Sequence, residues 1–240
     1  TELKFEVGGE EKSIAVTASM TISEFTKALN EAGVSANFDA DQQRFFINSA
    51  ESGEDFDFNF NVTNEDQELV LKNLGLLTAD YMVDKAVAIS VDENIADMQD
   101  NAQVKSLALA AASADGKAAS QDEFDALDDE TKKQYLDQAL VQIYDQGDPS
   151  VDISAVDYKD AAYIAERMSK LREELTAQNK EQLLSSDKYE ELKKNYAVKQ
   201  DAANAIIELN GATFEGSSNT FTINGSVSYT HLTLPTKLEV

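Results

Sequence analysis

The sequence predicts an α+β protein: a small antiparallel sheet-plus-helix module, then a helix-dominated module, then return strands near the C-terminal end. Three observations favour this class. Apolar residues alternate at period two over residues 3–16, 34–47 and 56–62, which is typical of half-buried strands. Ser/Thr-x-x-Glu capping boxes precede helical apolar periods. From about residue 80 the composition shifts towards Ala, Asp, Gln and Lys, and helix signals dominate.

The first predicted module, residues 1–78, begins with a hairpin and a helix. Alternating apolar residues flank Gly8-Gly9, a pair that turns readily, so residues 3–16 form the hairpin. Thr21 and Glu24 then form a capping box, and the apolar residues after it share one helical face as far as Gly33.

The same module continues with a second hairpin over residues 34–47 and a strand over residues 56–62. The strand places Phe56, Phe58 and Phe60 on one face, and we expect that face to be buried. A helix capped at residues 64–67 and ending at Gly75 follows it.

The second predicted module, residues 79–204, is rich in helices. Val87, Ile89 and Val91 alternate and predict one short strand before the helices. Helical periods follow over residues 95–109, after the Ser120 capping box, over residues 136–147, and over residues 189–196.

The strongest helical period of the chain is a seam with spacings of 3, 4, 3 and 4, formed by Ala161, Ile164, Met168, Leu171 and Leu175. It spans about two heptads, which favours packing inside one domain over a long coiled coil. Lys170 and Glu174 have the spacing of an ion pair on the outer face.

Residues 205–226 predict a return hairpin. Ile207 and Leu209 alternate in one strand and Phe221 and Ile223 in the other, and the polar run 215–219 forms an exposed connection. Residues 227–240 depart from the character of the rest, and we interpret them as a remnant of cloning or sequencing. They contain His231, the only histidine, which is therefore no catalytic candidate. Since the chain begins inside a strand pattern, we expect the native N-terminus to lie further upstream.

The composition excludes several function classes. Twenty basic residues against 45 acidic ones give a net charge of −25, which disfavours nucleic acid as a partner. The chain contains no cysteine, so disulfides and thiolate metal sites are impossible. No run of about eighteen apolar residues is present, so we expect no membrane insertion.

Carboxylates are the only abundant candidates for chemistry, and we assign none of them a catalytic, cofactor or metal role. The neighbouring pairs Asp128-Asp129, Glu173-Glu174 and Glu190-Glu191 show no spacing that indicates a cleft with two opposed acids. Two groups offer oxygen ligands for calcium but lack the order of an EF-hand loop, namely Asp92, Asn94, Asp97 and Asp100, and the stretch from Asp115 to Asp122. We therefore expect no enzyme activity and no cofactor.

Two parts of the chain resemble flagellar proteins. Ile22 to Gly33 followed by Val34-Ser35-Ala36, then residues 44–49 and Ser52-Gly53, resemble the flagellin-type "IN" motif, in which a helix ends in Leu-Asn-x-Ala-Gly-Val and strands follow. Asp201-Ala202, Leu209-Asn210-Gly211, Ser217-Ser218-Asn219-Thr220 and Ile223-Asn224-Gly225 resemble the middle of the flagellar filament-cap family, also called hook-associated protein two. The stretch between these parts carries no motif of the family.

The resemblance implies the head region of an exported structural protein at the flagellum tip. In that family the protein forms an extracellular ring, helps flagellin subunits to assemble, serves motility, and can contribute to adhesion through host-surface glycans. It implies no site residue. Two alternatives stay open: the outer domain of another hook-associated protein or flagellin, and an extracellular adhesin module that binds glycans.

Overall fold

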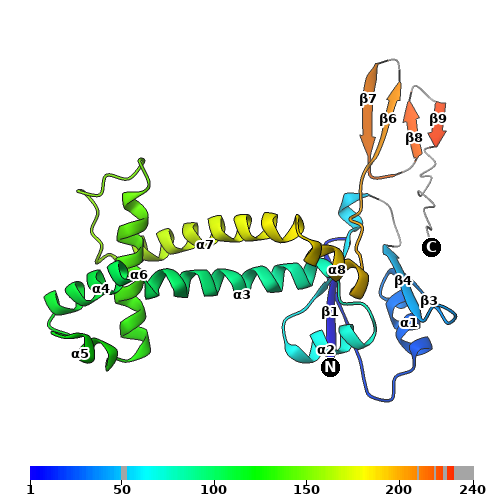
Figure 1. Cartoon of the computed structure of the whole chain (residues 1–240). Coiled ribbons are helices and arrows are strands. Elements are labelled where there is room, and N and C mark those ends of the chain that lie inside the picture. Colours follow the sequence, from blue (N-terminus) through cyan, green and yellow to red (C-terminus); the bar gives the residue numbers. More distant parts are fainter. Residues whose placement is uncertain (50–52, 210, 219, 224–225, 230–240) are drawn as a thin grey trace. The chain divides into compact units, whose positions relative to one another are not determined.

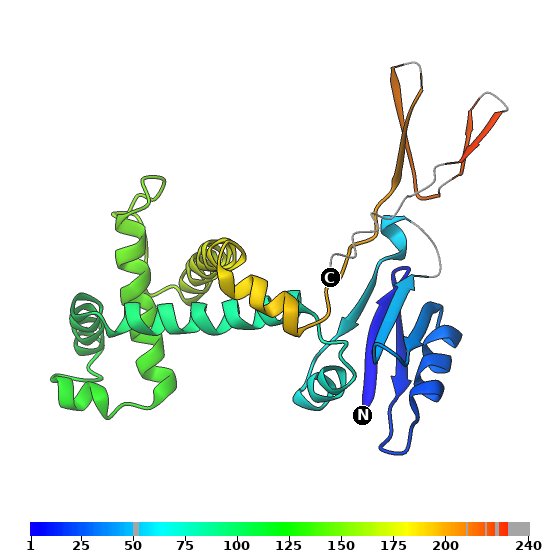
Figure 2. The same ribbon diagram turned by 45° about the vertical axis from the view of Figure 1, so that its right-hand side comes forward.

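The computed structural model describes residues 1–49, 53–209, 211–218, 220–223 and 226–229 (Figures 1 and 2). Its contacts divide the chain into two compact units. The sheet unit contains Thr1–Asp80 and the described residues from Lys193 onward, and the helix unit contains Tyr81–Leu192. The predicted α+β class is confirmed, because helices occur together with small antiparallel sheets. The sequence placed its boundaries near Thr78 and before Ala205, whereas the contacts change at residues 80 and 192.

The sheet unit combines short strands with three helical segments. Its strands are β1 (Glu2–Val7), β2 (Glu10–Ala15), β3 (Val34–Asp39), β4 (Arg44–Ser49), β5 (Phe58–Asn61), β6 (Ala205–Leu209), β7 (Ala212–Gly216), β8 (Thr220–Ile223) and β9 (Ser226–Tyr229). Its helical segments are α1 (Ile22–Glu31), the 3₁₀ turn η1 (Glu54–Phe56) and α2 (Glu65–Asn73). The strands form a three-stranded antiparallel sheet of order β2-β1-β5 and the separate antiparallel pairs β3-β4, β6-β7 and β8-β9.

The helix unit is built from helices that pack around one apolar core. Its helices are α3 (Ala79–Asp100), α4 (Ala102–Ala114), α5 (Gln121–Asp125), α6 (Asp129–Gln146), α7 (Ala161–Leu184) and α8 (Asp187–Asn195). The core contains buried side chains from all of them except α8, which packs Tyr189 and Leu192 against its edge. Among the described residues no helix is long and apolar enough to cross a membrane.

Local signals placed the first elements correctly. The predicted capping box is present at the start of α1, where the Glu24 N–H donates to the Thr21 hydroxyl at 3.2 Å and the Thr21 N–H donates to the Glu24 carboxylate at 2.8 Å. Helix α1 lies against β3, as Figure 1 shows. The two hairpins predicted over residues 3–16 and 34–47 are the pairs β1-β2 and β3-β4.

The phenylalanine strand differs from the prediction. Phe56 ends the 3₁₀ turn η1, so only Phe58 and Phe60 belong to β5. Both rings pack edge-on against buried Phe5 of β1, with ring centroids 5.4 and 5.9 Å away, but all three predicted rings are half-buried and not fully buried. Among the described residues β5 pairs with β1 alone, which makes it the edge of its sheet, and this explains the remaining exposure.

The strand predicted at residues 87–91 is wrong, because these residues lie in the long helix α3. Val83, Val87 and Val91 are buried at a spacing of four residues, whereas Ile89 is 53% exposed. The apparent alternation of Val87, Ile89 and Val91 combines two residues of the buried helical face with one of the opposite face.

The outer-face ion pair predicted on α7 is also replaced by other contacts. Met168, Leu171 and Leu175 are buried as the seam predicts, while Ala161 is exposed. Lys170 donates to Asp148 at 3.1 Å, and Glu174 faces Tyr144 and helps to raise the pKa of that phenol. Lys170 and Glu174 therefore each interact with a residue outside α7 and not with each other.

The single return hairpin predicted over residues 205–226 is two hairpins. Strand β6 pairs with β7, so that Ile207 lies opposite Phe214, and β8 pairs with β9. Gly211 adopts a positive φ of 80°, which lets the chain reverse directly after β6. Strand β9 covers the first residues of the segment interpreted as a remnant, and His231 lies outside the described residues.

Candidate functional site

The segment that resembles the flagellin-type motif forms a fixed corner between α1 and β3. Leu29 and Val34 are buried, and Gly33 has a φ of 93°, which favours glycine. The side chain of Asn30 donates to the Ala36 carbonyl at 2.9 Å and accepts from the Ala36 N–H at 3.1 Å. Leu29, Asn30, Gly33 and Val34 of the Leu-Asn-x-Ala-Gly-Val pattern thus each help the chain to turn from α1 into β3.

A second polar arrangement, which we call the return clamp, consists of Gly53, Glu54, Asp57, Lys199, Ala202, Asn204 and Ser217. The Asp57 carboxylate accepts from the Lys199 ammonium group and from the Ala202 N–H. Lys199 also donates to Asp201 at 2.8 Å. The Asn204 side chain accepts from the Glu54 N–H at 3.2 Å. These contacts fasten residues 199–204 to residues 54–57, more than 140 positions apart in the sequence.

Gly53 completes the return clamp through close approach. It is buried, with a φ of 106°, and a Cβ atom at this position would lie 2.6 Å from the Cβ of Ser217. No side chain fits in this space, so only glycine allows the two segments to meet. The contact joins the end of the first family-like motif to the Ser217-Ser218 part of the second.

Burial and charge pairing set the pKa values in the return clamp. Burial alone would raise the pKa of Asp57, but the hydrogen bonds from Lys199 and the Ala202 N–H outweigh it and lower that pKa. Burial likewise opposes the charge on Lys199, yet the carboxylates of Asp201 and Asp57 raise its pKa. The ion pair is therefore fully charged at neutral pH.

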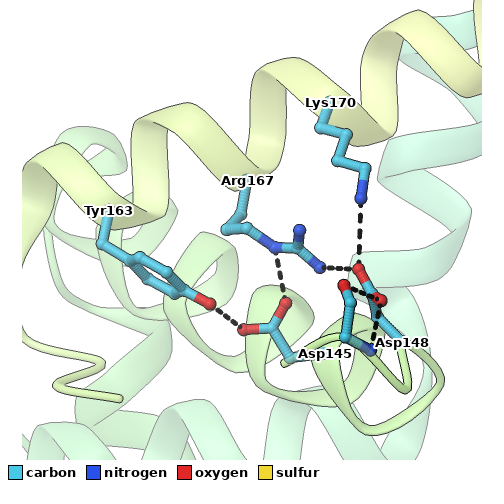
Figure 3. A network of polar contacts seen from close by, with 6 residues as sticks. Asp145, Asp148, Tyr163, Arg167 and Lys170 are labelled. Carbon is cyan, nitrogen blue, oxygen red and sulfur yellow. Dashed lines mark hydrogen bonds and ion pairs between the residues drawn. The ribbon is translucent and has the colours of Figure 1, made fainter. Parts of the chain in front are cut away.

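The helix unit holds a separate buried arrangement, the Arg167 cluster, formed by Tyr144, Asp145, Asp148, Tyr163, Arg167 and Lys170. Figure 3 labels all of these residues except Tyr144. The Asp145 side chain is 0% exposed and accepts from the Arg167 Nε at 2.6 Å and the Tyr163 hydroxyl at 2.7 Å. Arg167 also donates to Asp148 at 2.9 Å, and its guanidinium lies 4.8 Å from the centre of the Tyr144 ring. The cluster thus ties the C-terminal end of α6 to the first half of α7.

The pKa values in the Arg167 cluster follow from these contacts. Hydrogen bonds from the Ser150 hydroxyl and from Arg167 hold the pKa of Asp148 well below its usual range. Burial and the hydrogen bond to Asp145 raise the pKa of Tyr163 to about 12. Two carboxylates face two cations, so the cluster is balanced in charge and suited to structural anchoring rather than to proton transfer.

The carboxylates considered in the sequence have structural roles or lie at the surface. Asp128 caps α6 by accepting from the Thr131 N–H at 2.9 Å, and the neighbouring Asp129 pairs with Lys132. Glu173, Glu190 and Glu191 are exposed helix residues.

The groups considered as calcium ligands are dispersed. Asp92, Asn94, Asp97 and Asp100 are spread along α3, where Asp92 pairs with Arg172 and Asp100 with Lys105. Asp115 pairs with Lys159. Among the described residues no three metal-ligating side chains come together.

Comparisons of the chain with protein-family models, with curated proteins and with solved structures found no match. The functional interpretation therefore rests on the residues and their geometry.

Sequence reasoning missed the central residues of both arrangements. Lys199 lies in an irregular segment without periodicity. The sequence pattern placed its partner Asp57 on the polar face of a strand and indicated nothing more. Arg167 directly precedes a seam residue, and its buried partner comes from another helix. Of the residues in the two arrangements, only Gly53 could have been singled out from the sequence, because it is a glycine at the end of a recognisable motif.

Proposed function

We propose that the chain is the head region of a flagellar filament cap, a structural and interaction protein that promotes the assembly of flagellin subunits at the filament tip. The proposed partners are flagellin and, in the full-length protein, further copies of itself in a ring. The proposed location is the extracellular tip of the bacterial flagellum.

One observation carries this proposal: the two family-like segments, which the helix unit separates in the sequence, contact each other at Gly53 and Ser217. Motifs that occur by chance have no reason to share a contact. The Asn30 corner supports the proposal independently, since it gives the first motif a definite backbone role.

The points at which the chain leaves the sheet unit and returns to it also fit a head region with an inserted domain. Thr78 and Ala197 form a parallel bridge, with the Ala79 N–H donating to the Ala197 carbonyl at 2.8 Å. The chain therefore leaves the sheet unit and re-enters it at neighbouring points, as an insertion into a pre-existing module requires.

The test is a chimera in which residues 1–229, which include β9, replace the head of the cap protein in a motile bacterium. We expect the chimera to support filament growth, whereas a strain without any cap should release unassembled flagellin into the medium. Gly53→Val is the matched control, because its side chain would separate the two motifs. Release of flagellin by the unmodified chimera, despite its normal export, would refute the proposal.

A further inference from the structure

We infer that the α6–α7 loop, residues 147–160, is a recognition loop that docks a folded protein through Ile153 and the carboxylates beside it. The partner site would be an apolar pocket flanked by lysine or arginine side chains. Naming flagellin as that partner rests on the function proposed above.

Both ends of the loop are anchored. At its start, Asp148 accepts from Arg167 and Lys170 of α7, so the loop leaves α6 from the Arg167 cluster (Figure 3). At its end, Lys159 donates to Asp115 at 2.6 Å, and Asp160 caps α7 by accepting from the Ala162 N–H at 2.9 Å. A connection of this length without secondary structure is uncommon in a compact domain and is typical of functional loops.

The middle of the loop is shaped by its own residues. The Asp148 and Asp152 carboxylates accept from the backbone N–H groups of Ser150 and Ser154 at 3.0 and 3.1 Å. Within the described part of the chain, the hydrogen bonds of residues 151–156 stay inside the loop, which extends beyond the end of α6 in Figure 1. The loop is therefore ordered by turns and anchors while its tip stays free for contact.

The tip combines one large apolar side chain with negative charge. Ile153 is 49% exposed, and Asp152 and Asp157 are exposed on either side of it in the sequence. Burial of an isoleucine in a partner's pocket supplies affinity, and charged neighbours favour a basic rim. Because the loop is already held in shape, docking loses little conformational entropy.

A protein fits this tip better than a glycan does. Glycan sites generally offer an exposed aromatic face, and the aromatic residue of the loop, Tyr158, is half-buried with its ring centroid 6.2 Å from that of Tyr163. Its hydroxyl is buried and faces the Asp145 carboxylate of the Arg167 cluster, so it is turned away from any surface ligand.

The absence of cysteine allows a direct test on the full chain. Ile153→Cys and Ile89→Cys would each carry a thiol-specific photo-crosslinker and be mixed with monomeric flagellin. Ile89 is the matched control, since it is 53% exposed on α3. We expect crosslinks from position 153 and at most background from position 89. Equal yields from the two positions would overturn the inference.

A variant that places a charge at the tip tests this inference separately from the proposed function. In the cap chimera, Ile153→Asp should weaken flagellin binding at least about tenfold, roughly the effect of losing one buried isoleucine, whereas Ile89→Asp should leave it unchanged. If the unmodified chimera assembles filaments and Ile153→Asp does so equally well, the loop inference fails alone. If the unmodified chimera cannot assemble filaments, the proposed function fails, and the crosslinking result still decides whether the loop binds.

Discussion

Replacing Arg167 with methionine should destabilise the helix unit by about 3–5 kcal/mol, the usual cost of leaving one member of a buried ion pair alone. The Asp145 carboxylate is 0% exposed and the Arg167 side chain only 9% exposed, so water cannot replace the lost cation. Methionine fills much of the space of the arginine stem, and the expected loss is therefore electrostatic rather than a cavity effect.

The same helix provides a matched control in Arg172. It pairs with Asp92 at 2.7 Å, but the two side chains are 45% and 67% exposed. Ion pairs at the surface contribute about 0–1 kcal/mol, so Arg172→Met should have little effect. A second replacement, Asp145→Asn in the Arg167→Met background, should recover part of the stability because it removes the isolated charge.

The assay is guanidinium unfolding followed by circular dichroism at 222 nm, where α3 to α8 contribute strongly, together with hydrogen exchange of α6 and α7. Exchange is needed because two units can unfold in separate steps. If Arg167→Met costs no more than Arg172→Met, Asp145 must be able to find water or another partner, and the electrostatic reasoning is refuted.

Three further predictions concern the sheet unit and the whole chain. Because the folded-state pKa of Asp57 is lowered, its stabilisation is complete above the unfolded-state pKa and is lost as pH falls through the folded value. The protection factors of the backbone amides near Lys199, which are corrected for the intrinsic pH dependence of exchange, should therefore fall below about pH 4, and Asp57→Asn should remove this change. Gly53→Ala should cost more stability than Gly9→Ala in thermal unfolding, since both have positive φ but only the first would meet Ser217; equal losses would contradict a close contact. Light scattering should give a monomer at low salt, because a net charge of −25 opposes self-association, and a stable ring would contradict this.

Local signals account for the elements that the sequence predicted correctly. The Thr21 capping box, the Gly8-Gly9 turn and the helix end at Gly33 each depend on residues that are close in the sequence. The same holds for Asn64, whose side chain accepts from the Gln67 N–H at 3.0 Å at the start of α2. Such elements can be predicted without knowing the rest of the fold.

Elements that depend on distant partners could not be predicted. The strand expected at Val87 failed because Val87 and Val91 fit both periods, and only burial against the core of the helix unit decides between the two structures. The pair expected between Lys170 and Glu174 failed because Asp148 and Tyr144 of neighbouring segments offered partly buried alternatives. In the second case tertiary contacts outweighed a local preference worth a few tenths of a kcal/mol.

The contacts of the return clamp, which support the proposed function, all depend on the path of the chain. The return clamp can form only if the chain comes back to its point of departure, and the Ala197 N–H donating to the Leu77 carbonyl at 3.0 Å fixes that return. Once residues 77 and 197 are adjacent, only short segments separate them from Asp57 and Lys199, so closing the clamp costs little further entropy. The helix unit, with its own core, can then differ in sequence without disturbing the clamp. This accounts for a chain whose family-like motifs lie on either side of a stretch that carries none.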